Sequence, residues 1–230
     1  MSNLYSYVLR YDDGAAPNPY WDICTLAICK PAIRRNAKVG DWVIGTGSKH
    51  SRCNDNVTRD FSNHIVYAMK ITDVKTLEEY NEFCLVNFPE KIPNWKSNTW
   101  PIKMGDCIYN YVDKEPVLRE SVHKIGNQVR DISGNNVLMS DYFYYFGEDA
   151  RKLPDNLLDI IKRNQGHKKF VDSNLTQIFE DWINQFQKNH LYSDPQLRHA
   201  FDKPLSEQEC NTCAINHHQD DENEFEEVIC

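Results

Sequence analysis

The chain has 230 residues, of which 40% are hydrophobic and 12% aromatic, a balance typical of a globular protein with one well-buried core. No run approaches the roughly 20 apolar residues of a membrane helix, and the N-terminus lacks a basic segment followed by an apolar stretch. We therefore expect a cytoplasmic protein without a membrane span, in which the eight cysteines are reduced thiols.

The net charge of −8 is distributed unevenly. Residues 205–230 contain eight acidic residues and no Lys or Arg, whereas residues 1–204 contain 26 acidic and 26 basic residues. An acidic excess confined to one end does not exclude an anionic partner for the rest of the chain. Because this end is polar and lacks apolar periodicity, we expect residues 205–230 to form a poorly ordered tail.

The first half of the chain predicts mainly strands. Residues 4–11, 24–29 and 42–47 are rich in β-branched and aromatic residues, with turn formers between them. Pro31 is expected to end the second strand. A further apolar run at residues 64–74 leads into a helix, for which Thr76 is the expected N-cap and Glu79 completes a capping box.

The second half predicts fewer strands and an amphipathic helix. Residues 89–116 are loop-like with one strand at 106–112, and residues 137–146 form an aromatic strand. In residues 174–189, apolar side chains recur every three or four positions, as in a helix that packs on a core. The pattern predicts an α+β fold with a small, curved or barrel-like mixed sheet and C-terminal helices packed on it.

One stretch, CKPAIRRNAKVGDWVIGTGSK at residues 29–49, combines five cations with a turn, a strand and a glycine loop. Glycines allow backbone amides to approach an anion closely, and Arg side chains bind phosphate through a planar fork. Alternatively, the cations form a solvated loop and the glycines relieve a bend. The residues that would bind an anion here are Lys30, Arg34, Arg35, Thr46, Gly47, Ser48 and Lys49.

A second group follows the first strand. Arg10, Asp12 and Asn18, with nearby aromatic residues, are suited to hydrogen-bonding and stacking on a nucleobase. The alternative is an Asx-type turn with aromatic side chains folded back on the core.

Three residues are candidates for acid-base catalysis: Asp12, Asp106 and His123. Imidazole titrates near neutral pH, and a carboxylate such as Asp131 can orient it. A structural role for each is the alternative. In the tail, Cys210, Cys213, His217 and His218 lack the separation between ligand pairs of a zinc site, so we predict no metal site, and no cofactor is identified.

Four blocks, at residues 5–49, 65–80, 105–111 and 137–154, resemble the nucleotide modification associated domain 2 family. The 45-residue N-terminal block is the most specific. The resemblance spans about residues 4–170 and implies a role in a bacterial or phage system that makes or handles modified DNA bases, without assigning a reaction. A weaker likeness, in the succession of turn, strand, long loop and strand, is to the PUA-like barrels of EVE and ASCH domains, which bind modified or flipped bases.

The sequence therefore predicts a modification-associated domain at residues 1–170, a helical extension at 171–204 and the acidic tail at 205–230. The first functional hypothesis is binding of a nucleotide or a modified base in DNA, with Arg10, Asp12 and Asn18 on one wall and the 29–49 stretch supplying charge and phosphate contacts. The alternatives are an enzyme that acts on a modified nucleotide or base and a protein-interaction module.

Overall fold

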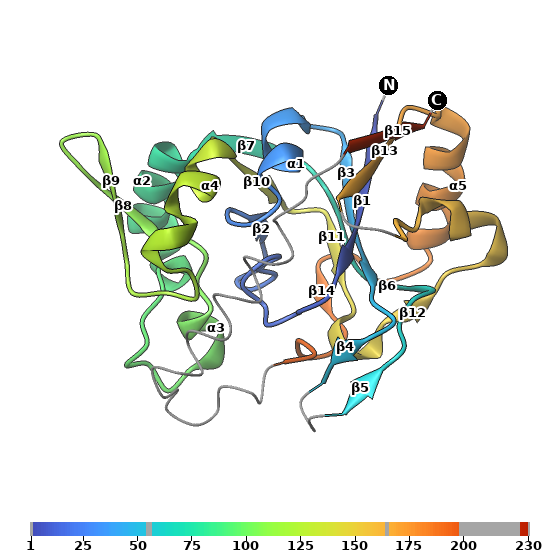
Figure 1. Ribbon diagram of the computed structural model, residues 1–230, viewed down its shortest axis with the longest axis horizontal. Helices are drawn as coiled ribbons and strands as arrows, with labels where there is room; N and C mark the ends of the chain where they lie inside the picture. Colours follow the sequence, from blue (N-terminus) through green and yellow to red (C-terminus); the bar gives the residue numbers. More distant parts are fainter. Residues whose placement is uncertain (1, 54–56, 164–165, 198–225, 230) are drawn as a thin grey trace.

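A mixed sheet forms the centre of the computed structural model, which describes residues 2–53, 57–163, 166–197 and the backbone of 226–229 (Figure 1). Its strands follow the order β14-β11-β6-β3-β1-β13-β15, and β12 also pairs with β6. The strands are β1 (Leu4–Leu9), β3 (Trp42–Gly47), β6 (His64–Lys70), β11 (Phe143–Tyr145), β12 (Arg151–Lys152), β13 (His167–Phe170), β14 (His190–Leu191) and β15 (Glu226–Ile229).

Smaller sheets and short helices surround this sheet. One sheet has the order β2-β10-β7, and two hairpins pair β4 with β5 and β8 with β9. These strands are β2 (Cys24–Leu26), β4 (Ser51–Arg52), β5 (Thr58–Arg59), β7 (Asp73–Thr76), β8 (Tyr109–Val112), β9 (Glu115–Leu118) and β10 (Asn136–Ser140). The α-helices are α1 (Pro31–Asn36), α2 (Leu77–Asn87), α3 (Trp100–Lys103), α4 (Gln128–Ser133) and α5 (Ser173–Ile183), and 3₁₀ turns occupy Pro89–Lys91, Ile125–Asn127, Gly147–Asp149 and Asp155–Ile160.

Both faces of the main sheet are buried. Successive side chains of a strand point to opposite faces, so Tyr5 and Tyr7 of β1 pack in one hydrophobic core while Leu4 packs in the other. The first core lies between the sheet and the elements around β2, β10 and α2, and α5 covers the opposite face (Figure 1). The sheet is therefore covered on both sides, and its edges and strand ends are where a ligand can approach.

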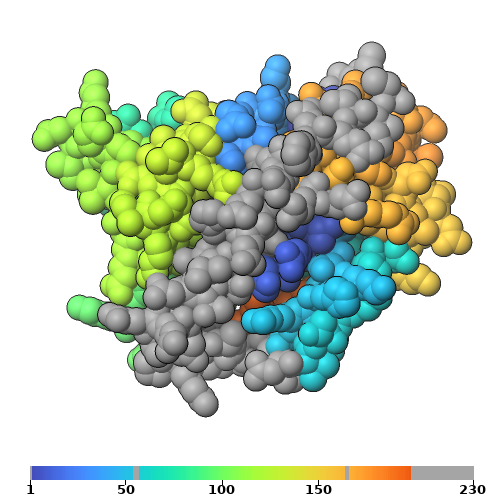
Figure 2. All heavy atoms as spheres, viewed as in Figure 1, coloured from blue at the N-terminus to red at the C-terminus, as the bar shows by residue number. Residues whose placement is uncertain are grey.

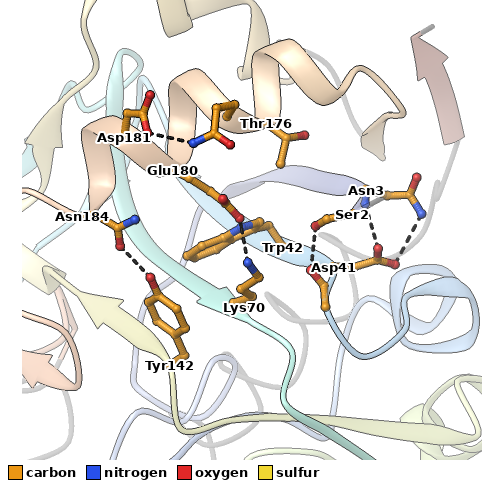
Figure 3. Close-up of polar contacts among 12 residues, drawn as sticks. Ser2, Asn3, Asp41, Trp42, Lys70, Tyr142, Thr176, Glu180, Asp181 and Asn184 are labelled. Atoms are coloured by element: carbon orange, nitrogen blue, oxygen red, sulfur yellow. Dashed lines mark hydrogen bonds and ion pairs between the residues drawn. The ribbon is translucent and has the colours of Figure 1, made fainter.

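Helix α5 is fixed to the outer face by polar contacts as well as apolar ones (Figure 3). The Trp42 indole Nε1 and the Lys70 Nζ both donate to Glu180 Oε1, at 2.7 and 2.8 Å. The Trp42 and Phe179 rings meet edge to face, with centroids 5.3 Å apart. These contacts tie the amphipathic helix expected from the sequence to β3 and β6.

The α+β prediction is confirmed, and so is the capping box at the start of α2, where Thr76 and Glu79 satisfy each other's backbone amides. The described strands form no closed barrel. Pro31 begins α1, because its fixed φ suits the first helical position. The expected strand at 137–146 is divided between β10 and β11, which belong to different sheets.

Among the strands not predicted from the sequence, two extend the main sheet beyond β1. β13 pairs antiparallel with β1 and is next to last in the strand order, although its sequence HKKF is basic. β15 pairs parallel with β13 and comes from the stretch expected to be a poorly ordered tail; residues 198–225 lie outside the described part of the chain. Within the described residues, no helix combines the length and apolarity needed to cross a membrane.

Candidate functional site

The ends of four strands meet at one edge of the main sheet. β1 and β3 are parallel, with Leu9 opposite Gly47, so their carboxyl ends lie together. β6 and β13 run antiparallel to these strands and begin at the same edge. Crevices beyond the carboxyl ends of parallel strands are common ligand sites. In the space-filling view, the dark blue start of the chain lies beside the light blue segment that follows β3 (Figure 2).

A cavity of about 520 Å³ opens at this edge. Its volume falls within the usual range for small-molecule sites, about 300 to 1,000 Å³. The segments that follow β1 and β3 line it, together with those that precede β6 and β13. The lining residues are Val8, Arg10, Lys30, Gly47, Ser48, Lys49, Asp60, Ser62, Ile161, Lys162, Arg163 and Gly166.

The cavity is strongly basic. Five of its side chains are Arg or Lys, and Asp60 is its only carboxylate within the described residues. The backbone amide of Ser62 donates to Asp60 Oδ1 at 2.9 Å, and hydrogen bonds from Ser62 lower the pKa of this carboxyl, so Asp60 is ionised at neutral pH. The remaining positive charge favours an anionic ligand.

Two of the five cations have little solvent exposure. Lys162 is 7% exposed and Lys30 is 8% exposed. The Lys30 Nζ lies 5.1 Å from the centroid of the Tyr7 ring, a cation-π contact. Cations with little solvent exposure interact more strongly with an anion than surface cations do, because water screens them less.

The loop after β3 supplies hydroxyl and amide groups. Ser48 Oγ accepts from the His50 amide at 3.1 Å, which leaves its hydroxyl hydrogen available to donate. A Cβ at Gly47 would collide with the Phe61 backbone, so glycine at this position permits the chain from β5 to β6 to pack closely. Gly45 similarly accommodates the Tyr67 ring, so both glycines of β3 serve packing.

Half of the predicted ligand-binding residues line this cavity. These are Arg10, Lys30, Gly47, Ser48 and Lys49. The other five do not line the cavity: Asp12, Asn18, Arg34, Arg35 and Thr46.

Arg34 is completely buried and acts as a clamp inside the protein. Its guanidinium donates to the carbonyl oxygens of Ala27 and Asp131, and so connects the turn before α1 with α4. Arg35 is exposed, and its Nη1 donates to the Ser133 carbonyl at 2.8 Å. The planar fork expected to bind phosphate thus binds backbone carbonyls in both residues.

Asp12 and Thr46 are also buried. Asp12 Oδ1 accepts from the Tyr145 hydroxyl at 2.5 Å, and the Asp12 carbonyl accepts from the Leu197 amide at 2.8 Å. Burial raises the pKa of the Asp12 carboxyl to about 7. The Thr46 hydroxyl donates to the Tyr7 carbonyl at 3.1 Å. Both residues connect neighbouring segments and do not line the cavity.

Asn18 and the catalytic candidate Asp106 belong to a buried polar network. Asp106 accepts from the Thr25 hydroxyl at 2.6 Å and the Tyr80 hydroxyl at 2.7 Å. The Lys91 Nζ donates to Asn18 Oδ1 at 2.8 Å and to Thr25 Oγ1 at 3.0 Å. Burial raises the pKa of Asp106 and lowers that of Lys91. The network joins β2 to the segment between α2 and β8, away from the cavity.

His123 has the acid-base partner that the sequence suggested. Its Nδ1 lies 2.7 Å from Asp131 Oδ2, which also accepts from the Tyr109 hydroxyl at 2.8 Å. On the other side of the ring, Nε2 lies 3.5 Å from the Cys29 sulfur. This row of side chains is buried and does not belong to the cavity lining.

Two cations of the cavity, Lys162 and Arg163, were not predicted from the sequence. Lys162 and Arg163 precede β13 and reach the cavity because β13 pairs with β1. A signal was present, since residues 162–169, KRNQGHKK, form a basic run with a glycine. Among the described residues, no group of three His, Cys, Asp or Glu side chains is arranged to hold a metal ion.

The model of one protein family, nucleotide modification associated domain 2, matches residues 1–202. The chain belongs to this family. No curated protein and no solved structure matches the chain.

The family match covers every residue of the cavity lining and also α5, which the sequence analysis placed in an extension beyond residue 170. Membership in a nucleotide modification associated family is consistent with involvement in a modification system. The basic cavity lies in the part of the chain that defines the family.

Proposed function

We propose that this protein binds the phosphate group of a nucleotide, or of a nucleotide unit of DNA, as part of a system that modifies DNA or nucleotides. The observation that carries the proposal is the cavity at the ends of β1 and β3, where five cations face one carboxylate. The family to which the chain belongs supplies the association with nucleotide modification.

The chemistry of the lining suits a phosphate ester. Arg10 and Arg163 provide planar forks that match two phosphate oxygens, and Ser48 provides a hydroxyl donor. Val8 and Ile161 add apolar surface suited to a sugar or a base. Binding of a modified base beside the phosphate, in the manner implied by the likeness to PUA-like domains, is part of the proposal, and that likeness rests on the strand pattern of the sequence.

The proposed site is narrower than the one expected from the sequence. It keeps Arg10, Lys30, Gly47, Ser48 and Lys49 and adds Lys162 and Arg163. It omits Asp12, Asn18, Arg34, Arg35 and Thr46, whose polar groups form hydrogen bonds within the fold and which do not line the cavity.

The test is a calorimetric titration with dTMP, its 5-hydroxymethyl analogue and thymidine. Both nucleotides are expected to bind and thymidine, which lacks the phosphate, is not. Affinity is expected to fall between 50 and 200 mM salt, because salt screens the partly exposed cations. Equal binding of thymidine and dTMP, or an affinity independent of salt, would contradict the proposal. A short single-stranded oligonucleotide, titrated in parallel, distinguishes DNA from free nucleotide as the preferred ligand.

An enzymatic function is the second candidate, and the His123–Asp131 pair favours it. Its test is incubation with modified and unmodified nucleotides, with and without divalent metal, followed by mass spectrometry of the products. Absence of any product would leave binding as the function.

A further inference from the structure

Cys29, His123 and Asp131 form a connected row across three segments of the fold. The Cys29 sulfur is 3.5 Å from His123 Nε2, and His123 Nδ1 is 2.7 Å from Asp131 Oδ2. Nucleophile, base and orienting carboxylate in this order are the arrangement that activates a cysteine or serine for covalent catalysis. The five described cysteines, which include Cys29, are in the thiol form.

The direction of the hydrogen bond between His123 and Asp131 follows from the charge of Asp131. Burial alone would raise the pKa of Asp131, but His123, Arg34 and Tyr109 together lower it, so the carboxylate is ionised. An ionised carboxylate only accepts, so His123 Nδ1 donates to Asp131 Oδ2. Nε2 is then the ring nitrogen that faces the Cys29 sulfur.

The backbone at Cys29 is unusual for a residue with a side chain. Cys29 has φ 59° and Lys30 has φ 43°, both in the left-handed region. Such a conformation is strained for a residue with a Cβ, and it persists where surrounding structure enforces it, often at functional sites. Here the sharp turn joins β2 to α1, as nucleophile turns join a strand to a helix in hydrolases.

Arg34 holds the turn at Cys29 in place. Its guanidinium donates to the Ala27 carbonyl, two residues before Cys29, and to the Asp131 carbonyl. A Cβ at Gly134 would collide with the same guanidinium, so the packing there is tight. One buried side chain therefore fixes the nucleophile's turn relative to the helix that carries the orienting carboxylate.

We propose that Cys29 is a nucleophile that His123 deprotonates and Asp131 positions, and that it forms a thioester with an acyl group of an ester or amide. The sulfur attacks the carbonyl carbon while Nε2 takes the thiol proton. The tetrahedral adduct collapses, the bond to the leaving alcohol or amine breaks, and His123 returns the proton to that group. A water molecule, deprotonated by His123, then attacks the thioester, which releases a carboxylic acid and restores the thiol.

The position of the turn indicates which esters or amides are suitable. Cys29 immediately precedes Lys30, which lines the basic cavity, and adjacent Cα atoms are only about 3.8 Å apart. A substrate with a phosphate in the cavity and an acyl group toward this turn would be suitable; this part of the inference rests on the proposed function. The thiol chemistry itself does not depend on it.

Several other titratable or charged groups surround the Cys29 thiol. Mutation of His123 and Asp131 is therefore needed to show that the pH dependence of the thiol's reactivity comes from these two residues. These groups are Tyr7 of β1, Tyr67 of β6, Cys24 of β2, Lys30 and Arg34 beside and within α1, Tyr109 of β8 and Asp131 of α4.

The first test is alkylation of the full chain with iodoacetamide, with the rate at each cysteine determined by peptide mass spectrometry. Cys24 is the internal control, because it is completely buried and burial raises the pKa of its thiol to about 12. We expect Cys29 at pH 7 to react about tenfold faster than an ordinary thiol, whose pKa is near 8.5. As the pH is raised, the alkylation rate of Cys29 in the wild type should reach its plateau below pH 8.5. In His123→Gln the rate should still be rising as the pH approaches 8.5.

Asp131→Asn is the second variant, since it keeps the size of the side chain but removes the charge that fixes the ring proton. The same loss of reactivity is expected with an unchanged circular dichroism spectrum. A Cys29 rate and pH profile equal in the wild type and in either variant would overturn the proposal, as would a rate no higher than that of Cys24.

The second test uses p-nitrophenyl acetate, with release of p-nitrophenolate and the mass of the Cys29 peptide as readouts. The proposal expects a burst of release and an acetylated Cys29 that loses its acetyl group with time. Absence of an acetyl adduct at Cys29 would refute the acyl-transfer chemistry. Neither test contains a nucleotide, so a failure of nucleotide binding and a failure of the thiol chemistry are separately recognisable.

Discussion

Replacement of Lys162 by methionine tests the basic cavity most directly. Methionine preserves most of the apolar length of the lysine side chain, so Lys162→Met removes charge with little change in packing. Coulomb's law gives about 4 kcal/mol for two charges 4 Å apart at an effective dielectric constant of about 20. Net contributions of hydrogen bonds to charged groups are about 1.5 to 3 kcal/mol.

Because Lys162 is almost buried, we expect a loss of about 2 kcal/mol in nucleotide binding, or roughly 30-fold in Kd. Lys49 also lines the cavity but is exposed, and Lys49→Met should weaken binding only two- to fivefold. Asp60→Asn removes the single described carboxylate of the lining and should strengthen binding of the same anion. The three variants thus differ in the sign and the size of their effects.

The assay is calorimetric titration with dTMP at 50 mM salt. Lys96→Met is the matched control, since this lysine is exposed and does not line the cavity. Thermal unfolding of every variant confirms that the fold is retained. Equal effects of Lys162→Met and Lys96→Met, or a weakening by Asp60→Asn, would refute the assignment of the phosphate to this cavity.

Three further predictions concern the residues around the site. Burial raises the pKa of Asp12 to about 7, so its contribution to stability is complete below about pH 4 and is lost as pH rises to about 7, by up to about 4 kcal/mol. Between pH 5 and pH 8, the free energy of urea unfolding should therefore decline less in Asp12→Asn than in the wild type. An equal decline would contradict this. Arg34→Met should cost about 3 kcal/mol or more in urea unfolding, because the carbonyls of Ala27 and Asp131 each lose a hydrogen bond from a buried charged donor, whereas Arg35→Met should cost under about 1 kcal/mol; similar costs would exclude the clamp. Gly47→Ala should lower the melting temperature through overlap with Phe61, at about 1 to 3 kcal/mol, and an unchanged melting temperature would mean that the loop relaxes freely.

The residues of the site that could be predicted are those next to strands with a clear pattern. Ser48 and Lys49 directly follow β3, and Arg10 directly follows β1. Each strand is recognisable from its apolar and aromatic residues, so the polar residues at its end stand out. That the two ends meet is a consequence of the parallel pairing of β1 with β3, and nothing in either segment alone specifies that pairing.

The residues that could not be predicted depend on contacts over long sequence distances. Lys162 and Arg163 reach the cavity only because β13, a short basic strand, pairs with β1. Basic residues disfavour burial, and the strand is not evident from periodicity. Its place beside β1 is set by the hydrogen-bonding edge that β1 offers and by Phe170, which packs in the core beneath α5.

Arg34 shows why charge in a sequence is a weak guide to exposure. The sequence suggests a phosphate clamp because Arg34 and Arg35 are adjacent cations beside a glycine loop. In the fold, Arg34 lies on the inner side of the short helix α1, where its guanidinium donates to the carbonyls of Ala27 and Asp131. A guanidinium satisfies several acceptors at once, which a lysine cannot do with the same geometry.

The turn at Cys29 and Lys30 connects the two proposed activities physically. Two consecutive left-handed residues reverse the chain sharply between β2 and α1, so Lys30 faces the cavity while the Cys29 sulfur meets His123. An ordinary extended residue at either position would turn one of these side chains away. Cys29→Gly should relieve the strain of the turn, whereas Cys29→Ser should retain both the strain and the contact with His123. Urea unfolding should therefore find Cys29→Gly more stable than Cys29→Ser, and equal stabilities would contradict a strained turn at this position.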